Sequence, residues 1–393
     1  MMSFTPTKDQ IIGAIEAKKW WREQNDPFFV VSGAPGTGKT TFCRYLIEEI
    51  GLSLDQVLFV SFMGKAATRM AQNGINAKTI DSAIYYYRKE PTKDENGNYL
   101  IGKHGSLKLT MVKHLRTALP KKYKLIVVEE YGMVNKQYGE DLASFGLPII
   151  FLGDENQISP PFGSRFIERD PNVTLRQIMR QSENDPIVWL CQQIIHNRRL
   201  EPGQYGNSMV LRKEQINREI MMKSDIIITQ SNQLRYQTNQ LFREEFRKYK
   251  RLDILHVNEK VVCRKNNWSK EINHIYMTNG MTGFVDHIYA DELKPDRFVF
   301  DFRPDFLPVS FGHIKADYKS FFLQPGTEEY MENQVIHKDK FEFAYAITDY
   351  SSQGSEWNTV LCFHEKRGKD SMEILRRLYT AVSRAKKAVY IVI

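Results

Sequence analysis

The sequence contains few cysteines, no long apolar run, and neither a low-complexity tract nor a long linker. Its four cysteines are far apart and form no CxxC pair; they are Cys43, Cys191, Cys263 and Cys362. This spacing indicates neither a zinc site nor a disulfide framework. We therefore expect four buried, reduced thiols.

No apolar stretch approaches the roughly 20 residues that a helix needs to cross a membrane. The start, Met-Met-Ser-Phe-Thr, lacks the basic and apolar regions of a signal peptide. From these absences we expect no membrane partner and a cytoplasmic location.

The chain does have length and an excess of positive charge. Its 393 residues are enough for two or three domains, each with its own core. A hydrophobic share of 42% and a charged share of 26% are typical of a globular protein. The formal charge of +8 favours a polyanionic partner such as nucleic acid, but many basic proteins bind none, so charge alone leaves the choice open.

The most informative stretch is residues 33–40, GAPGTGKT, which follows the apolar run 28–31. Glycines let backbone N–H groups surround phosphates, and the N-terminus of the next helix favours their negative charge. Lys39 is expected to contact the β- and γ-phosphates, and Thr40 to bind Mg²⁺ through its hydroxyl. The stretch thus predicts a nucleoside triphosphate site. The residues expected at the nucleotide are Pro35, Gly36, Thr37, Gly38, Lys39, Thr40 and Thr41.

A helix is predicted over residues 11–21, with Thr7 as its N-cap. The side-chain amide of Gln10 both donates and accepts, so it can pair with an adenine edge. An exposed glutamine at a helix start is the simpler interpretation of this residue taken alone.

Two adjacent carboxylates follow a predicted buried strand. Residues 125–128 form the strand, and Glu129 and Glu130 come directly after it. The carboxyl ends of parallel strands form the edge where ligands of open α/β sheets bind. One glutamate can hold Mg²⁺, and the other can orient and deprotonate the attacking water.

Another predicted strand, residues 147–152, ends shortly before Gln157. A polar amide at this place can sense the γ-phosphate. Residues 163–180 are expected to leave the first sheet, with Arg176 and Arg180 flanking a short helical stretch.

The segment 87–106 interrupts the α/β rhythm with many charges and an Asn96-Gly97 pair. Asn-Gly is the strongest short hairpin-turn signal. We expect a two-stranded ribbon that stands out from the domain.

The order of these motifs resembles that of superfamily 1 DNA helicases of the RecD-like and phage Dda group. In the first half the resemblance rests on the phosphate loop, VSFMGKAATRM, KTIDS, VVEEYGM, GDENQISP and residues 175–180. In the second half it rests on IIITQSN, SQGSE and LYTAVSRA. It covers nearly the whole chain.

This resemblance implies an α/β fold with two RecA-like parallel-sheet P-loop domains in tandem. It also implies a hairpin insertion in the first domain and a small SH3-like β-barrel insertion in the second. The expected boundaries are 1–86 and 123–180 for the first domain, 87–122 for the hairpin, 181–257 and 340–393 for the second domain, and 258–339 for the barrel.

The family assigns roles to matching residues around one ATP. Gln10 would read adenine, and Gln157 would link the γ-phosphate to the nucleic acid. Arg180 and Arg384 would neutralise charge on the transferred phosphoryl group, as arginine fingers do. Further residues are expected near the phosphates and ribose: Gln353, Gly354 and Glu356.

The family's carboxylate pair implies that Glu129 lies on the metal side with Thr40, and that Glu130 is the base. Aspartate is usual at the position of Glu129, so the metal contact must shift or run through water. The pair Tyr350-Ser351 replaces the usual His-Lys, which removes a basic contact.

The insertion contains alternating aromatics at Phe298, Phe300 and Phe302. Such residues can stack on bases, but alternation along a strand is more typical of one face of a core. Core packing is the interpretation that the alternation favours.

The function implied is an ATP-dependent DNA helicase that moves 5′ to 3′ on single-stranded DNA and separates the duplex ahead. Strand contacts are expected at Lys65, Thr79 and Asn232, through side chains that bind phosphates without reading sequence. Tyr99 in the ribbon would be a strand-separating pin, or it would only pack the ribbon's strands together.

The implied partners are single-stranded and fork DNA, with replication or recombination proteins, and the expected state is a monomer. If a phage encodes the chain, its location would be the host cytoplasm. Two alternatives remain: a viral-type superfamily 1 RNA helicase, and an ATP-gated nucleic-acid-binding module with weak turnover.

Overall fold

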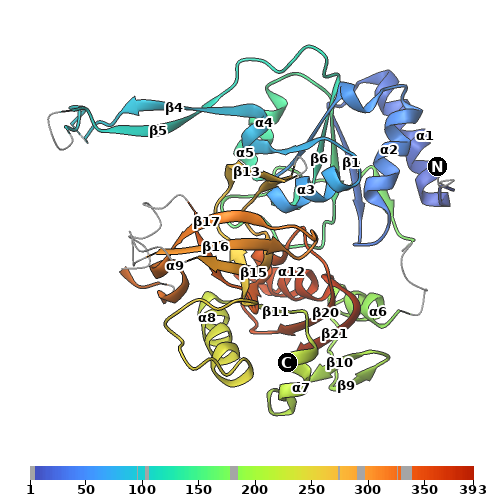
Figure 1. The fold of residues 1–393 in the computed structure, drawn as a ribbon. Helices are drawn as coiled ribbons and strands as arrows, with labels where there is room; N and C mark the ends of the chain where they lie inside the picture. Colours follow the sequence, from blue (N-terminus) through green and yellow to red (C-terminus); the bar gives the residue numbers. More distant parts are fainter. Residues whose placement is uncertain are drawn as a thin grey trace.

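The computed structural model describes residues 5–94, 96–101, 106–177, 185–272, 275–289, 297–324, 326–328 and 339–393. Two parallel-stranded sheets lie at the centre of the molecule, a third sheet lies beside the second, and a long two-stranded ribbon extends from the first (Figure 1). Among the described residues, no helix is both long and apolar enough to cross a membrane.

The first sheet has six parallel strands in the order β3-β2-β6-β7-β1-β8. The strands are β1 (Phe28–Gly33), β2 (Val57–Ser61), β3 (Ala77–Thr79), β6 (Leu125–Glu129), β7 (Ile149–Gly153) and β8 (Val173–Leu175). The helices of this half are α1 (Lys8–Glu23), α2 (Lys39–Glu49), α3 (Gly64–Gln72), α4 (Ile80–Ile84) and α5 (Lys136–Ala143).

Both faces of this sheet are covered, which is why its strands are continuous apolar runs. Successive strand residues point to opposite faces, so Phe29 and Val31 pack with α1 and α2, while Val30 packs on the side of α4 and α5. Because these strands run parallel, the carboxyl ends of β1, β6 and β7 lie at one edge of the sheet.

One sequence expectation for this half is wrong. Residues 163–180 were expected to leave the first sheet, but β8 (Val173–Leu175) pairs in parallel with β1. Val173 and Leu175 are buried in the same core as α1 and α2. Burial of these apolar side chains favours the pairing of β8 with the sheet over an exposed connection. The expected helical stretch next to Arg180 lies largely outside the described residues.

The second sheet has the order β19-β11-β20-β21-β10-β9, and only the edge strand β9 is antiparallel to its neighbour. The strands are β9 (Gly203–Tyr205), β10 (Ser208–Leu211), β11 (Ile226–Thr229), β19 (Ala346–Thr348), β20 (Trp357–Phe363) and β21 (Ala385–Val392). The helices are α6 (Pro186–Ile195), α7 (Arg218–Lys223), α8 (Asn232–Leu241), α11 (Asp349–Ser352) and α12 (Ser371–Val382). Helices α6 and α12 pack on one face, and α7 on the other.

The inserted strands form a five-stranded antiparallel sheet in the order β17-β16-β15-β12-β18. Its elements are β12 (Lys260–Cys263), β15 (Thr282–Tyr289), β16 (Arg297–Pro304), β17 (Phe311–Asp317), α9 (Tyr318–Phe322) and β18 (Phe341–Phe343). Phe300 and Phe302 are fully buried, and the partly buried Phe298 packs against the same cluster through Phe321, so core packing, not base stacking, is confirmed for these aromatics. Closure of this sheet into an SH3-like barrel stays a prediction.

A separate hairpin, β13 (Asn267–Ile272) with β14 (Ile275–Met277), projects from this insertion toward the first sheet. Short helical turns complete the chain: η1 (Leu54–Gln56), η2 (Tyr131–Met133), η3 (Lys213–Gln215) and the π-helical turn η4 (Phe242–Phe246).

Buried ion pairs fasten the inserted sheet to α8 and the segment after it. Glu342 accepts hydrogen bonds from Arg235 at 2.8 Å and from Arg264 at 2.7 Å. Arg243 and Glu259 form a second pair at 2.5 Å, and both are completely buried. Separating the partners of such a pair would leave buried charges uncompensated. These contacts therefore favour one orientation of the insertion relative to α8.

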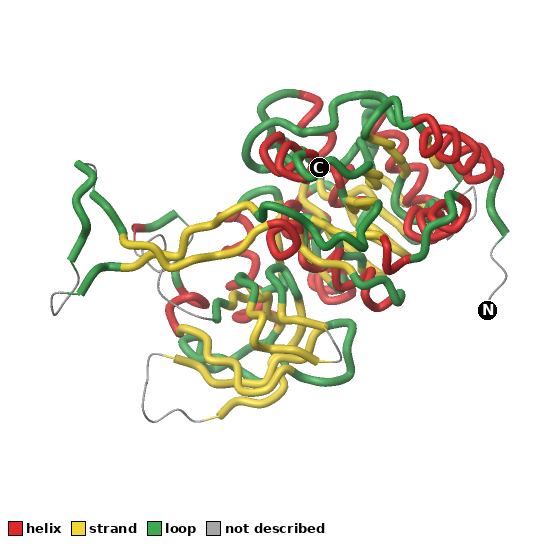
Figure 2. Tube along the Cα trace, turned by 90° about the horizontal axis from the view of Figure 1, so that it is seen from above, coloured by secondary structure: helices red, strands yellow, loops and turns green. Residues whose placement is uncertain are grey.

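The ribbon consists of β4 (Tyr85–Pro91) and β5 (Leu109–Leu115), which extend far from the first sheet (Figure 2). Its outer part is not a simple continuation of these strands. Lys93 pairs with Tyr99 around the Asn96-Gly97 turn, and Ile101 pairs with Leu107. Tyr99 therefore lies on a middle segment between two outer ones.

The four cysteines are free thiols; Cys43, Cys263 and Cys362 are buried, whereas Cys191 is partly exposed.

Candidate functional site

The phosphate loop joins β1 to α2 at the carboxyl edge of the first sheet. Gly36 and Gly38 have φ angles of 87° and 78°, which favour glycine. No side chain caps the first turn of α2, so its N–H groups can face a phosphate. The Lys39 ammonium donates to the carbonyls of Gly33 at 2.7 Å and Ala34 at 3.1 Å.

The carboxylate pair lies directly beside this loop. The Thr40 hydroxyl donates to Oε1 of Glu129 at 2.8 Å. Oε2 of Glu129 is buried and has no hydrogen-bond partner among the described residues. Glu130, the next residue, has a left-handed backbone with φ 57°. Such a conformation is strained in a non-glycine residue and is often retained where it aims a functional side chain.

These residues fit a magnesium ion. Mg²⁺ prefers oxygen ligands and is usually held by one or two side chains together with substrate phosphates. The Thr40 hydroxyl and the unpartnered Glu129 oxygen supply such ligands next to the phosphate loop.

Burial raises the pKa of Glu129, and the charge of Glu130 adds to this effect. Arg69, the Thr40 hydrogen bond and Lys39 oppose it. A nearby cation would favour the ionised form of this carboxylate.

Lys39 lies within electrostatic reach of the same carboxylates. Burial lowers the pKa of Lys39, whereas the charges of Asp154, Glu130 and Glu129 act to raise it. Burial likewise raises the pKa of Asp154, which Lys39 opposes. The loop therefore holds the buried Lys39 ammonium near these carboxylates. When a phosphate binds, the ammonium can donate to phosphate oxygens instead of the loop carbonyls.

Arg69 on α3 is a site residue that the sequence interpretation missed. Its guanidinium lies 3.6 Å from Oε1 of Glu356, which belongs to the second half of the chain. Burial would lower the pKa of Arg69, but the charges of Glu129, Glu356 and Glu130 outweigh it and raise the pKa. Its position four residues after Lys65, and so on nearly the same helix face, was a usable signal.

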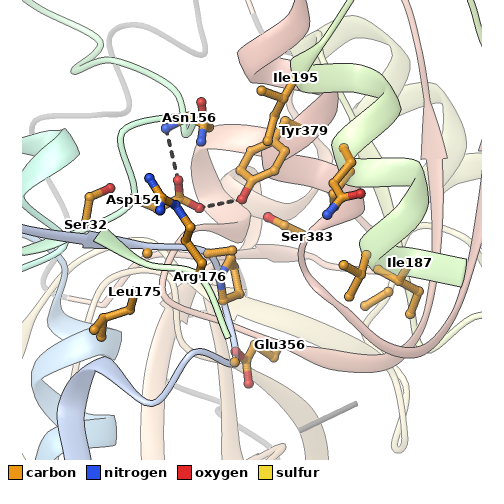
Figure 3. Close-up of a pocket in the computed structure, with 18 of the residues that line it drawn as sticks. Ser32, Asp154, Asn156, Leu175, Arg176, Ile187, Ile195, Glu356, Tyr379 and Ser383 are labelled. Atoms are coloured by element: carbon orange, nitrogen blue, oxygen red, sulfur yellow. Dashed lines mark hydrogen bonds between the residues drawn. The ribbon is translucent and has the colours of Figure 1, made fainter. Parts of the chain in front are cut away.

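Helix α12 contacts the nucleotide edge from the second sheet. The Tyr379 hydroxyl donates to Oδ2 of Asp154 at 2.6 Å, and the Ile158 amide donates to the Thr380 hydroxyl at 3.0 Å. Figure 3 shows Tyr379 reaching across to Asp154, which also accepts from the Asn156 amide. These contacts join the two halves of the chain. The sequence does not predict them, because neither the segment around Asp154 nor α12 indicates which residue it contacts in the other half.

A cavity of about 670 Å³ lies along this junction. Its walls include the phosphate loop, the end of β8 and the start of β21. Arg176, Lys386 and Lys387 supply positive charge to its lining. A nucleoside triphosphate on the loop would thus lie between the two sheets.

Gln10 lies next to the phosphate loop but is buried. Its side chain closes a capping box with Thr7, whose role as N-cap is confirmed, and its Nε2 donates to the Thr37 carbonyl at 3.5 Å. Gln157 is also buried, near Asp154, and Arg165 donates to its carbonyl.

Arg384 is buried just after α12, and it donates to the Ser355 carbonyl of the SQGSE motif at 3.5 Å. Its guanidinium donates to the Thr380 carbonyl at 3.1 Å and to the Ser383 hydroxyl at 3.0 Å. Arg180 lies outside the described residues. The structure therefore brings neither arginine into a described contact with the phosphate loop.

Residues of the SQGSE motif lie at the junction with α3. Glu356 also lies 3.7 Å from Lys386. Gly354 has φ 72° and approaches the backbone of Ala66 closely. Oε1 of Gln353 is buried without a hydrogen-bond partner among the described residues.

The residues expected to bind DNA are placed differently from one another. Lys65 is buried, donates to the Ser351 carbonyl at 3.3 Å, and has its pKa lowered by burial to about 7. The Thr79 hydroxyl caps α4 through the Ser82 amide. Asn232 is exposed at the start of α8.

The fold and this site define an α/β protein with a parallel-sheet P-loop core of the helicase type. Residues 17–202 match the model of an AAA domain family, and residues 343–392 match that of a UvrD-like helicase C-terminal domain. The chain is 24% identical over 390 residues to the ATP-dependent RecD2 DNA helicase of Deinococcus radiodurans. This alignment covers 91% of the chain and 46% of that relative. The alignment with a second curated relative covers 36% of that protein, so the chain spans less than half of the length of either relative.

Solved structures of a Bacteroides Pif1 helicase share the fold. The chain matches Pif1 bound to ssDNA with a TM-score of 0.56 at 17% identity, over 99% of this chain and 92% of that one. It matches the complex with ADP-AlF3 and ssDNA with a TM-score of 0.54, at the same identity and coverage. These structures show a shared fold, and the family models and the curated relative support a superfamily 1 helicase of the RecD-like type.

Proposed function

We propose that the chain is an ATP-dependent DNA helicase that moves 5′ to 3′ along single-stranded DNA and separates fork DNA ahead of it. One observation carries this proposal. The phosphate loop and Asp154 line a cavity together with Tyr379 of α12, which belongs to the other sheet. A ligand that changes charge at this junction also changes the spacing of the two sheets, and such a change can drive stepping.

In this proposal each site residue has a chemical task. Lys39 binds the β- and γ-phosphates, Thr40 and Glu129 hold Mg²⁺, and Glu130 takes a proton from the attacking water. Bound Mg²⁺ would neutralise charge on the phosphates. Gln10 would read the adenine by resemblance, and Gln157 and Asp154 would link the phosphates to α12.

The arginine fingers belong to the proposal as well. Arg384 lies just after α12 and would turn from its present acceptors, the Thr380 and Ser355 carbonyls and the Ser383 hydroxyl, toward the phosphates. These acceptors are neutral, so a phosphate would be a stronger partner. Arg180 keeps its proposed role by resemblance alone.

The domain division follows the same reasoning. Residues 1–86 with 123–180, and 181–257 with 340–393, are the proposed RecA-like halves around the cleft. The proposed insertions are 87–122, which meets the fork, and 258–339. Strand β18 pairs with the inserted sheet, so that insertion includes Phe341–Phe343 as well.

The proposal is tested with ATP hydrolysis and strand displacement. We expect phosphate release to rise several-fold with oligo-dT and less with oligo-rU. A duplex with a 5′ single-stranded tail should be separated, whereas the same duplex with a 3′ tail or blunt ends should not.

Each other result of this test has a clear meaning. Greater stimulation by oligo-rU would indicate an RNA helicase, and separation of the 3′-tailed duplex would reverse the polarity. Nucleotide binding without phosphate release would indicate a gated binding module and would overturn the proposed activity.

The ribbon gives a second test, at Tyr99. The Tyr99 side chain is 54% exposed, and the Lys93 ammonium lies 5.0 Å from its ring centre. If the ring replaces base stacking at the fork, Tyr99→Ala should reduce duplex separation roughly tenfold while strand-stimulated ATP hydrolysis persists, since stacking is worth about 1–3 kcal/mol per base. Strand displacement and phosphate release are measured on the same preparations.

Tyr99→Phe is the matched control, because it keeps the ring and removes only the hydroxyl. It should separate duplex as wild type does. If Tyr99→Ala leaves separation intact, the ring only packs on Lys93 within the ribbon, and the pin is not at this residue.

A further inference from the structure

A cluster of side chains attaches the inner end of the long ribbon, β4 with β5, to the first domain. This end of the ribbon lies beside α4 and α5 (Figure 1). Helix α4 runs directly into β4, because Ile84 ends the helix and Tyr85 begins the strand. The charged centre of the cluster is Lys113 on β5, which pairs with Tyr87 on β4.

The Lys113 ammonium contacts both helices. Its Nζ donates to Oδ1 of Asp81 on α4 at 3.0 Å and to the Tyr138 hydroxyl on α5 at 3.0 Å. The Tyr138 hydroxyl in turn donates to Oδ2 of Asp81 at 2.9 Å. The three side chains therefore form a closed ring of hydrogen bonds that joins β5 to α4 and α5.

The same ammonium lies over two aromatic rings. It is 3.9 Å from the ring centre of Tyr85 on β4 and 4.5 Å from that of Tyr138. A cation within about 6 Å of a ring centre is attracted by the ring. The two rings meet edge to face with centres 5.7 Å apart, and the Tyr85 hydroxyl donates to Asp141 on α5. Both strands of the ribbon are thus bonded to α5.

Lys113 stays charged in this cluster. Partial burial acts to lower its pKa, but the hydrogen bonds to Tyr138 and Asp81 outweigh this effect and raise the pKa. The side chains of Lys113 and Asp81 are 33% and 40% exposed, and an isolated ion pair of this exposure would contribute little to stability. Here one cation contacts a carboxylate, a phenol hydroxyl and two rings, so loss of its charge would weaken four contacts together.

The length of the ribbon makes its direction sensitive to this inner end. Each long strand has 7 residues, and at about 3.3 Å per residue it spans about 23 Å. A tilt of about 10° at the base would therefore move the outer end by about 4 Å, which exceeds the roughly 3.4 Å between stacked base pairs. A ribbon that must meet one base pair thus needs a rigid base.

Farther along the ribbon, the described side chains contact one another. The Thr92 and Thr110 hydroxyls are hydrogen-bonded at 3.2 Å, and the Lys93 ammonium lies over the Tyr99 ring. Such contacts hold the two strands together but do not fix their direction relative to the domain. Because a two-stranded hairpin alone is marginally stable, its direction depends on packing at its base.

We propose that Lys113 is a positioning residue, which fixes the direction of the ribbon through Asp81 and Tyr138, and that duplex separation depends on it. ATP hydrolysis and binding of single strands do not depend on it, because Lys113 lies on the ribbon and away from the phosphate loop. This inference rests on the proposed function, in which the ribbon meets the fork, and it adds the contact that holds the ribbon there.

Lys113→Met tests this role, because it keeps the aliphatic stem and removes the ammonium. Separation of the 5′-tailed duplex should fall about fivefold or more, since fewer molecules hold the ribbon in the separating direction. Strand-stimulated ATP hydrolysis and the Kd for a fluorescent dT12 oligonucleotide should stay within about twofold of wild type. All three are measured on one preparation, so hydrolysis and binding also report that the variant is folded.

Three further variants are the controls. Lys113→Arg keeps a cation that can bond to a carboxylate and lie over a ring, so it should retain most of the separation. Lys89→Met removes an equal charge from an exposed position on β4 and should separate duplex within about twofold of wild type. Asp81→Asn added to Lys113→Met should cost little beyond Lys113→Met alone, because the two residues act in one network.

The direction of the ribbon is also measured without any activity. Spin labels are placed at Lys108→Cys, beside the outer end of β5, and at Lys19→Cys on α1, both of which are exposed positions. The background carries Cys191→Ser, which removes the partly exposed thiol. Pulsed electron paramagnetic resonance should give one narrow distance distribution when Lys113 is present and a broader one in Lys113→Met.

The inference fails if Lys113→Met separates duplex as wild type does, or if its distance distribution is unchanged. An equal loss of separation in Lys89→Met would overturn it too, because the charge of the ribbon and not its direction would then matter. A parallel loss of hydrolysis or strand binding in Lys113→Met would place Lys113 in the strand site instead. In each case separation by wild type leaves the proposed function standing. If wild type separates no duplex, the proposed function fails, and the role of Lys113 in separation fails with it.

Discussion

Lys39→Ala should lower strand-stimulated ATP hydrolysis by about 10³-fold or more, into the background of a phosphate-release assay. Lys39 supplies the only formal positive charge within residues 33–40. Its ammonium already points at the loop carbonyls of Gly33 and Ala34, where the phosphates would lie. An alanine leaves the charge that develops on the phosphates without its nearest cation.

The same variant should keep its fold. Burial lowers the pKa of Lys39, so folding penalises its charged form, and removing it relieves this penalty while breaking two hydrogen bonds. These opposed effects should leave the free energy of unfolding within about 1 kcal/mol of wild type. Urea unfolding followed by circular dichroism measures this value.

Lys136→Ala is the matched control, since this lysine is exposed on α5 in the same half of the chain. It should hydrolyse ATP as wild type does. Wild-type turnover in Lys39→Ala with saturating oligo-dT would show that the loop is not the hydrolysis site. An unfolded Lys39→Ala protein would contradict the stability argument.

Local patterns in the sequence were enough to predict the nucleotide edge of the first sheet. The strand before the loop, the loop itself and the helix after it form one continuous segment, so their arrangement depends on neighbours in sequence. The same holds for β6 and the carboxylates that follow it. Short-range geometry brings these groups to one edge, as expected for parallel strands.

Contacts between distant segments could not be predicted in this way. The strand β8 joins the sheet only because β1 offers an open edge and a buried face beside it. The bond from Tyr379 to Asp154 joins residues that are 225 positions apart. Neither pairing has a local signal, because each residue type is common and its partner belongs to a segment that is distant in sequence.

The ribbon is an intermediate case. The Asn96-Gly97 signal correctly marks a turn, and Gly97 has φ 85°. It does not tell which strands the turn joins, and the long strands pair Tyr85–Pro91 with Leu109–Leu115 instead. Turn chemistry is local, whereas register depends on the whole ribbon.

Charged groups link the two halves of the site. Asp154 is bonded to Tyr379 and lies within electrostatic reach of Lys39. Arg69 lies between the carboxylate pair and Glu356. A phosphate bound to Lys39 would therefore change the electrostatic environment of Asp154, which bonds to α12, and of Arg69, which pairs with Glu356. This arrangement supplies the differential contacts that a ligand needs to shift a conformational equilibrium.

Glu130→Gln should bind ATP yet lower its hydrolysis by about 10²- to 10⁴-fold, because an amide cannot accept the proton of the attacking water. Binding should persist or tighten. The charge of Glu130 helps to raise the pKa of Glu129, so its removal lets Glu129 ionise more readily at the metal side. A fluorescent ATP analogue measures binding, and phosphate release with saturating oligo-dT measures hydrolysis.

Glu129→Gln separates the tasks of the two carboxylates. Glu129 bonds to Thr40 and has the unpartnered oxygen, so the amide should weaken Mg²⁺-dependent nucleotide binding, which Glu130→Gln should not. Glu140→Gln, an identical change at an exposed position on α5, should alter neither property. If Glu130→Gln hydrolyses ATP within twofold of wild type, Glu130 is not the base. If instead Glu129→Gln binds normally and only hydrolysis is lost, the two roles are exchanged, and the strained backbone at Glu130 then aims a metal ligand.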